Sequence, residues 1–307
     1  MTEPLPFQDL FVSASDGLRL YARDYDPGGD RLPVVCLPGL ARTSADFHAL
    51  AIALSRDADA PRRILCLDYR GRGRSDWDRN WRNYDLKVET ADVLQVLTVA
   101  GVHEAVIVGT SRGGLIAMSL AALRPSLLRG VVLNDVGPVI DGKGLVRIRG
   151  YVGALPAPRS LDEGAEILKR LSDAQFPSFT RADWRAQAEV TWREQDGRLV
   201  PAYDPALRKT LEGIDLETPL PTLWPLFEGL GGVPVLVLRG AHSDILSAGT
   251  LAEMERRHPR LRAVTVPGQG HAPVLAGPLV EEIVGFVRDA GSRVATPIRT
   301  EASTAAP

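Results

Sequence analysis

The sequence predicts an α/β protein with a mostly parallel, doubly wound sheet. Short continuous apolar runs, which are typical of strands covered on both faces, recur at 33–37, 64–67, 105–108, 131–133, 234–238 and 261–266. Segments with helical features separate most of these runs, at 44–56, 87–100, 112–123 and 248–257. Because strands that alternate with helices form parallel sheets, this order indicates one large α/β core.

The two ends of the chain differ from this pattern. Asp16-Gly17 separates two short alternating segments, 11–14 and 18–23, and this dipeptide favours the tight turn of an antiparallel hairpin. A closing helix is expected over 278–289. From 291 to 307 the composition turns to Ala, Thr, Ser and Pro, which predicts a disordered tail.

One long segment interrupts the alternation of strands and helices. Between 137 and 232 there is no convincing buried strand, but helix starts are marked at Ser160 and Thr180, each three residues before an acidic side chain. We therefore predict a helical cap over 137–232, inserted between the core segments 1–136 and 233–290.

Composition and charge exclude several classes of partner and location. The 307 residues carry a net charge of −2, which offers no attraction for nucleic acid or an acidic membrane surface. The first residues lack a signal-peptide pattern and no apolar run approaches membrane-spanning length, so a cytoplasmic enzyme is expected. Both cysteines, Cys36 and Cys66, lie in apolar runs and are expected to be buried, reduced thiols.

A serine stands where an apolar strand meets a helix. Ser111 follows the run 105–108, and Gly109 and Gly113 leave room for a sharp turn. The first N–H groups of the following helix have no internal partners and can bind a developing oxyanion. Residues 109–113 fill the pattern G-x-S-x-G and resemble the nucleophile elbow of the α/β-hydrolase family. That resemblance covers most of 10–290 and implies an eight-stranded sheet, a cap after the sixth strand and a nucleophilic serine.

A serine nucleophile needs a base within hydrogen-bond reach. His271 lies in the glycine-rich segment 268–273 after the last predicted strand, where a loop could bring it to Ser111. His242 also follows a strand and stays ambiguous. The other three histidines lie in predicted helices or at their ends, where packing or surface roles are expected: His48, His103 and His258.

Two aspartates can supply the carboxylate that orients the base. The family resemblance implies the chain order Ser, then Asp or Glu, then His, which selects Asp244 and Asp135. Asp244 follows the strand before the last one, where most family members place the acid, and we favour it. Asp135 follows the preceding strand, a position that some members use, and its other interpretation is a helix-capping or loop-anchoring role.

The resemblance also implies an oxyanion hole and excludes other chemistry. The backbone N–H groups of Leu40 and Arg112 correspond to the two donors, although Pro38 stands where the family often has histidine. The segment 67–75 resembles the loop after the fourth strand, to which we assign a structural role. Its glycines lack the dinucleotide-binding spacing, and no His or Cys cluster has metal-ligand spacing, so we expect neither cofactor nor metal.

Together these residues favour a serine hydrolase that cleaves a carboxylic ester or lactone by acyl transfer. A serine nucleophile argues against epoxide hydrolases and haloalkane dehalogenases, which need a carboxylate there. Tryptophans in the predicted cap suggest an apolar acyl or aromatic group, namely Trp184, Trp192 and Trp224. A carbon-carbon bond hydrolase, a perhydrolase and a non-catalytic binder of small ligands stay open, as does a homo-oligomer.

Overall fold

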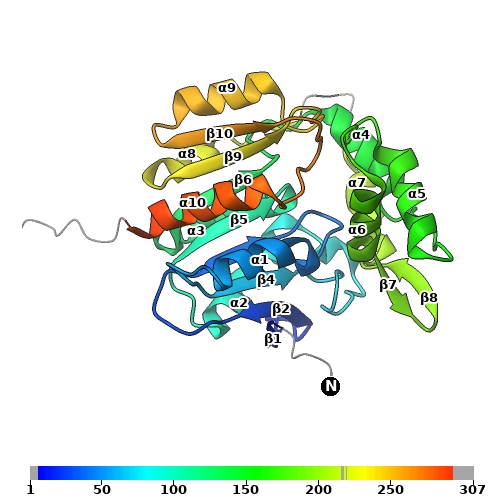
Figure 1. The fold of residues 1–307 in the computed structure, drawn as a ribbon, viewed down its shortest axis with the longest axis horizontal. Coiled ribbons are helices and arrows are strands. Elements are labelled where there is room, and N and C mark those ends of the chain that lie inside the picture. Colours follow the sequence, from blue (N-terminus) through cyan, green and yellow to red (C-terminus); the bar gives the residue numbers. More distant parts are fainter. Residues whose placement is uncertain (1–5, 216–217, 219, 293–307) are drawn as a thin grey trace, which may run out of the picture.

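The computed structural model describes residues 6–215, 218 and 220–292. Eight strands form one sheet in the order β1-β2-β4-β3-β5-β6-β9-β10 (Figure 1). The strands are β1 (Gln8–Ser13), β2 (Arg19–Tyr25), β3 (Val34–Leu37), β4 (Ile64–Asp68), β5 (Ala105–Thr110), β6 (Leu128–Asn134), β9 (Val235–Gly240) and β10 (Leu261–Val266). β1 and β2 form the predicted hairpin, β2 also runs antiparallel to β4, and the remaining pairs are parallel. The predicted fold class is confirmed.

Helices cover both faces of this sheet. On one face, α1 (His48–Ser55) and α10 (Pro278–Ser292) pack on the strand side chains represented by Val34 and Val106. On the other face lie α2 (Leu86–Val99), α3 (Arg112–Leu123), α8 (Trp224–Glu228) and α9 (Ala248–Arg257). This double cover explains why the central strands are continuously apolar, and it buries both free cysteines.

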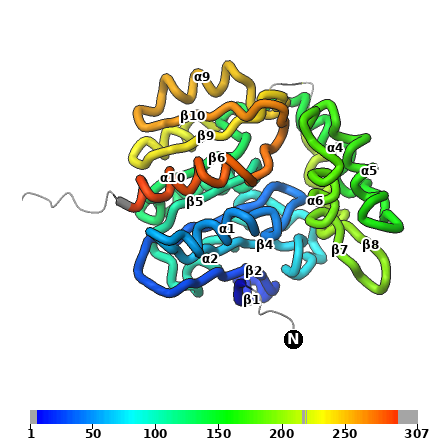
Figure 2. The backbone as a smooth tube through the Cα atoms, viewed as in Figure 1, coloured from blue at the N-terminus to red at the C-terminus, as the bar shows by residue number. Residues whose placement is uncertain are grey.

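The chain leaves the sheet after β6, forms the cap and returns to β9 (Figures 1 and 2). The cap contains α4 (Gly142–Tyr151), α5 (Leu161–Ser172), α6 (Arg181–Thr191), β7 (Trp192–Gln195), β8 (Arg198–Pro201) and α7 (Lys209–Glu212). The short 3-10 helices of the described chain are η1 (Ser44–Phe47), η2 (Trp81–Asn83), η3 (Pro125–Leu127), η4 (Pro205–Arg208) and η5 (Gly229–Gly232).

Two features of the segment 137–232 differ from the expectation of helices alone. β7 and β8 form an antiparallel hairpin around Asp196 and Gly197, which both have positive φ. The sequence did not predict these strands because each has four residues and only Trp192 among them is buried. In addition, α8 and the turn after it pack on the core through Phe227 and Leu230.

The ends of the described chain bear on two further expectations. Gly291 and Ser292 belong to the end of α10, whereas the rest of the predicted tail, 293–307, lies outside the described residues. Among the described helices, none combines the length and the apolar composition that a membrane crossing requires.

Candidate active site

Ser111 lies on a strained turn between β5 and α3. Its φ of 50° and ψ of −109° lie in a region that side chains rarely adopt. A Cβ on Gly113 would stand 2.0 Å from the carbonyl oxygen of Leu37, and a Cβ on Gly109 would stand 2.5 Å from the backbone of Gly113. The two glycines are therefore required for the close approach of α3 to β3 and β5.

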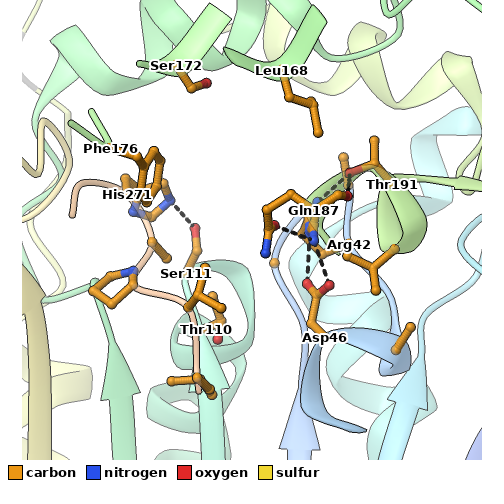
Figure 3. A pocket seen from close by; sticks show the side chains of 18 of the residues that line it. Arg42, Asp46, Thr110, Ser111, Leu168, Ser172, Phe176, Gln187, Thr191 and His271 are labelled. Carbon is orange, nitrogen blue, oxygen red and sulfur yellow. Dashed lines mark hydrogen bonds and ion pairs between the residues drawn. The ribbon is translucent and has the colours of Figure 1, made fainter. Parts of the chain in front are cut away.

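The hydroxyl of Ser111 meets an imidazole, and the imidazole meets a carboxylate. Nε2 of His271 lies 2.9 Å from Oγ of Ser111, as Figure 3 shows. Nδ1 of His271 lies 2.8 Å from Oδ2 of Asp135. The side chains of His271 and Asp135 are 7% and 0% exposed. A buried carboxylate at Nδ1 holds the ring so that Nε2 can accept the serine proton.

The structure corrects the favoured assignment of the carboxylate. Asp244 does not supply it, because both of its oxygens accept from Arg147 of α4, at 2.6 and 2.8 Å. Asp135 follows β6, the direct neighbour of β5, whereas Asp244 follows β9, one strand further from Ser111. Burial raises the pKa of Asp244, but the hydrogen bonds and charge of Arg147 outweigh burial and leave that pKa below its ordinary value.

The loop after β9 nevertheless contributes to the site. The backbone N–H of Gly240 donates to Oδ1 of Asp135 at 2.8 Å, and the hydroxyl of Ser243 donates to Oδ2 at 2.6 Å. Asp135 itself has a φ of 56°, which turns the chain sharply after β6. Sequence reasoning did not identify Ser243, the residue directly before the favoured aspartate.

The two predicted oxyanion donors are backbone N–H groups of residues close to Ser111, one close in sequence and one close in space. Arg112 is the first residue of α3, so its N–H has no partner within the helix. Leu40 lines the cavity at Ser111, and a Cβ on the preceding Gly39 would stand 3.9 Å from Cβ of Ser111. The segment that contains Leu40 therefore packs beside Ser111, and Arg112 directly follows Ser111 in the chain.

A cavity of about 480 Å³ lies between the core and the cap, with Ser111 and His271 in its wall. Its apolar lining from the cap includes Leu168, Phe176, Phe179 and Trp184. Trp184 therefore lines the cavity, in agreement with the apolar contact that the sequence suggested for it. The two other predicted tryptophans lie in different surroundings: Trp192 donates to the carbonyl of Pro156, and Trp224 packs on Phe227 and Arg257.

Polar side chains also line the cavity; they include Tyr151, Tyr203 and, across from Ser111, Arg42 (Figure 3). Arg42, on the loop after β3, donates to Asp46 at 2.6 and 2.7 Å. It also donates to Thr191 at 2.9 Å and to Gln187 at 3.2 Å, both on α6 (Figure 3). Arg42 thus joins the core to the cap across from Ser111, a role that its sequence position did not indicate.

The remaining predicted residues have structural partners. His48 bonds Tyr25 at 2.9 Å and His258 bonds the carbonyl of Leu230 at 3.1 Å, as expected for packing roles. Asp68, the last residue of β4, accepts from the N–H groups of Ser44 and Arg74 at 2.6 and 2.9 Å and so holds the loop that follows. The cap also contacts the backbone of His271: Oε1 of Gln175 accepts from its N–H at 3.1 Å.

A sheet of this order with a serine elbow at the end of its fifth strand defines enzymes of the α/β-hydrolase fold. The chain belongs to this family: the sequence pattern of the alpha/beta hydrolase fold matches residues 33–152, and a hydrolase that is 36% identical matches 82% of this chain. The predicted family and the predicted enzyme class are thereby confirmed.

Three relatives extend this result beyond the core. The chain is 36% identical to a 3-hydroxybutyrate-oligomer hydrolase of Cupriavidus necator, over 82% of this chain and 86% of that protein. It is 29% identical to a 2-(acetamidomethylene)succinate hydrolase of Mesorhizobium japonicum, over 76% and 79% respectively. A crystal structure of an alpha/beta hydrolase from Novosphingobium aromaticivorans superposes with a TM-score of 0.86 at 38% identity, covering 93% of this chain and 99% of that chain.

Proposed function

We propose that this protein is a serine hydrolase that cleaves small carboxylic esters through Ser111, His271 and Asp135. The observation that carries the proposal is the continuous hydrogen-bonded chain from Oγ of Ser111 through His271 to Asp135. The strained backbone at Ser111 supports it, because strain of this kind is maintained where function needs a presented side chain.

In the proposed reaction, Oγ of Ser111 attacks the carbonyl carbon of the ester and gives its proton to Nε2 of His271. The backbone N–H groups of Leu40 and Arg112 stabilise the negative oxygen of the tetrahedral intermediate. The imidazolium then protonates the leaving alcohol, and an acyl group stays on Ser111. Water, deprotonated by His271, releases the carboxylic acid, while Asp135 stabilises the imidazolium in both steps.

The substrate class follows from the two walls of the cavity. Its volume of about 480 Å³ is in the range of small-molecule sites. Phe176 and Trp184 offer an apolar surface, whereas Arg42, Tyr151 and Tyr203 offer N–H and O–H groups. We propose a short ester with additional oxygen atoms, such as an oligomer of a 3-hydroxy acid. The Cupriavidus necator relative, named for such a substrate, supports this choice. Lactones are cyclic members of the same class.

A labelling experiment and an ester panel test the proposal together. A fluorophosphonate should label wild-type protein on Ser111 and leave Ser111→Ala unlabelled. The panel contains p-nitrophenyl acetate, p-nitrophenyl butyrate, the 3-hydroxybutyrate dimer and a butyrolactone. We expect hydrolysis of the first three by wild-type protein only. A folded wild-type protein that stays unlabelled would favour a non-catalytic binder. Labelling of Ser111 without hydrolysis of any ester would favour the carbon-carbon bond hydrolase or the perhydrolase.

A further inference from the structure

A buried arginine reaches the loop that contains Leu40. Arg72 follows β4 and its side chain is fully buried. Its Nε donates to the carbonyl oxygen of Leu40 at 2.8 Å, and its Nη1 donates to the carbonyl of Arg70 at 2.6 Å. The guanidinium carbon lies 5.6 and 5.4 Å from the ring centres of Tyr69 and Tyr84. These contacts fix the arginine itself in one orientation.

A single carboxylate connects this arginine to the start of α3. Oε1 of Glu89, on α2, accepts from Nη1 of Arg72 at 2.5 Å, and Oε2 accepts from Nε of Arg112 at 2.7 Å. Glu89 is 0% exposed and the side chain of Arg112 is 17% exposed. Arg112 is held further by the carbonyl of Tyr84, to which Nη2 donates at 3.2 Å.

The ends of this network are the two residues with the proposed oxyanion donors. We propose that Arg72, Glu89 and Arg112 form a positioning network that fixes the backbone of Leu40 relative to Ser111 and Arg112. The inference rests on the proposed function, since it concerns the same reaction. Arg72, Glu89 and the side chain of Arg112 are positioning groups, because they act through the backbone N–H groups and not on the substrate.

The physical basis is the cost of misplacing a hydrogen-bond donor. The N–H and the carbonyl of Leu40 flank one α carbon, so a fixed carbonyl restricts the rotation that would turn the N–H away from Ser111. Donors that are oriented before the reaction need no reorganisation when charge develops, which is the main source of oxyanion stabilisation. The network also carries one net positive charge, mostly on buried groups, where a charge acts more strongly on a nearby oxyanion than it would in solvent.

An equally buried ion pair on the same helix offers a matched control. Asp92, also on α2, binds Arg70 at 2.7 and 2.8 Å, and the two side chains are 6% and 1% exposed. Neither side chain of this pair contacts Leu40 or Arg112 in the described hydrogen bonds. Asp92→Asn therefore tests the loss of a buried charge on α2 whose partner, Arg70, contacts the network only through its backbone carbonyl among the described hydrogen bonds.

The test compares Glu89→Gln and Arg72→Lys with Asp92→Asn and wild type. One readout is the hydrolysis of p-nitrophenyl acetate, and the other is inhibition by a trifluoromethyl ketone, whose adduct with serine imitates the tetrahedral intermediate. Removal of one oxyanion donor costs about 10² to 10³ in kcat, so a loosened donor should cost about 10- to 100-fold. We expect kcat to fall by that factor in both network variants, Ki for the ketone to rise in parallel, and KM to change by less than about twofold.

The outcomes separate this inference from the proposed function. Asp92→Asn should change kcat by less than about threefold, and Tm is measured for every variant. The inference is overturned if network variants with a Tm equal to that of Asp92→Asn lose no more kcat and ketone affinity than it does. If Glu89→Gln does not fold, Arg72→Lys carries the test, because it keeps the charge but not the fork that reaches both Leu40 and Glu89. A wild-type protein that forms no ketone adduct on Ser111 would instead contradict the proposed function.

Discussion

The carboxylate of Asp135 binds Nδ1 of His271 at 2.8 Å, and Asp135 directly follows β6, the strand next to the one that ends before Ser111. Ser243 and Asp244 are neighbours in the sequence but have different partners. The hydroxyl of Ser243 donates to Asp135, while Asp244 forms an ion pair with Arg147 of the cap. The loop after β9 therefore supports the carboxylate of Asp135 through Ser243 and holds the cap through Asp244.

Asp135→Asn should reduce the rate of acylation by about 10⁴-fold, as the equivalent change does in the template triad, because an amide stabilises the wrong imidazole tautomer. Asp244→Asn should leave the acylation rate within about tenfold of wild type, since its partner Arg147 is not part of the reacting chain. The measurement is the pre-steady-state burst of p-nitrophenol from p-nitrophenyl acetate.

Circular dichroism of both aspartate variants provides the control for folding. A full burst rate in Asp135→Asn, together with a lost burst in Asp244→Asn, would return the assignment to Asp244. Severe losses in both variants would mean that the two carboxylates share the role.

Ser111→Gly should be inactive and at least as stable as wild type. A φ of 50° strains a residue that has a Cβ, and such strain costs on the order of 1–3 kcal/mol. Glycine removes the strain but loses about 0.5–1 kcal/mol through the greater entropy of the unfolded chain. Chemical denaturation measures the balance, with Ser111→Ala as the matched variant that keeps the strain. A Ser111→Gly protein clearly less stable than Ser111→Ala would show that the turn is not strained.

Gly113→Ala should destabilise the fold by about 1–3 kcal/mol, because its Cβ would stand 2.0 Å from the carbonyl oxygen of Leu37. The control is Gly285→Ala in α10, where nothing lies within 4 Å of the added Cβ. That control should stabilise the protein by about 0.5–1 kcal/mol. Thermal unfolding compares the two variants. Equal effects would mean that α3 can move away from β3 without cost.

The sequence identified those features that local patterns determine. Apolar runs located the core strands, and G-x-S-x-G placed Ser111 at its turn. The partner of His271 could not be derived in the same way, because both candidate aspartates follow strands and no local pattern shows which carboxylate meets the imidazole. Arg147 lies in the cap, 97 residues before Asp244, and no local pattern connects them. Likewise, Arg72 and Glu89 belong to different elements and become partners only through packing.

Stability should fall steeply in acid because of the pair of Asp57 and Arg288. The hydrogen bonds of Arg288, at 2.6 and 2.9 Å, lower the pKa of Asp57 from 3.8 to about 2. A carboxyl with a lowered pKa stabilises the fold above its unfolded value, and this contribution disappears as the pH falls from about 4 toward 2. Urea unfolding between those pH values should therefore show a steeper loss for wild type than for Asp57→Asn. Parallel curves would exclude this pair as a source of acid sensitivity.

The last prediction concerns the wall of the cavity opposite Ser111. Arg42 donates to Gln187 and Thr191 of α6 and pairs with Asp46. Burial lowers the pKa of Arg42, but the charge and hydrogen bonds of Asp46, together with the nearby tyrosines, leave that pKa above its ordinary value. Arg42→Met should remove the guanidinium charge from this wall while keeping an apolar side chain of similar length. If the wall binds oxygen atoms of the acyl group, kcat/KM for p-nitrophenyl 3-hydroxybutyrate should fall about tenfold relative to p-nitrophenyl butyrate.

Arg185→Met is the control, because Arg185 lies on α6, the helix that Arg42 contacts, and pairs with Asp162 and Glu189. It should change both substrates equally. An equal loss for both substrates in Arg42→Met would show that Arg42 holds the cap without selecting the acyl group.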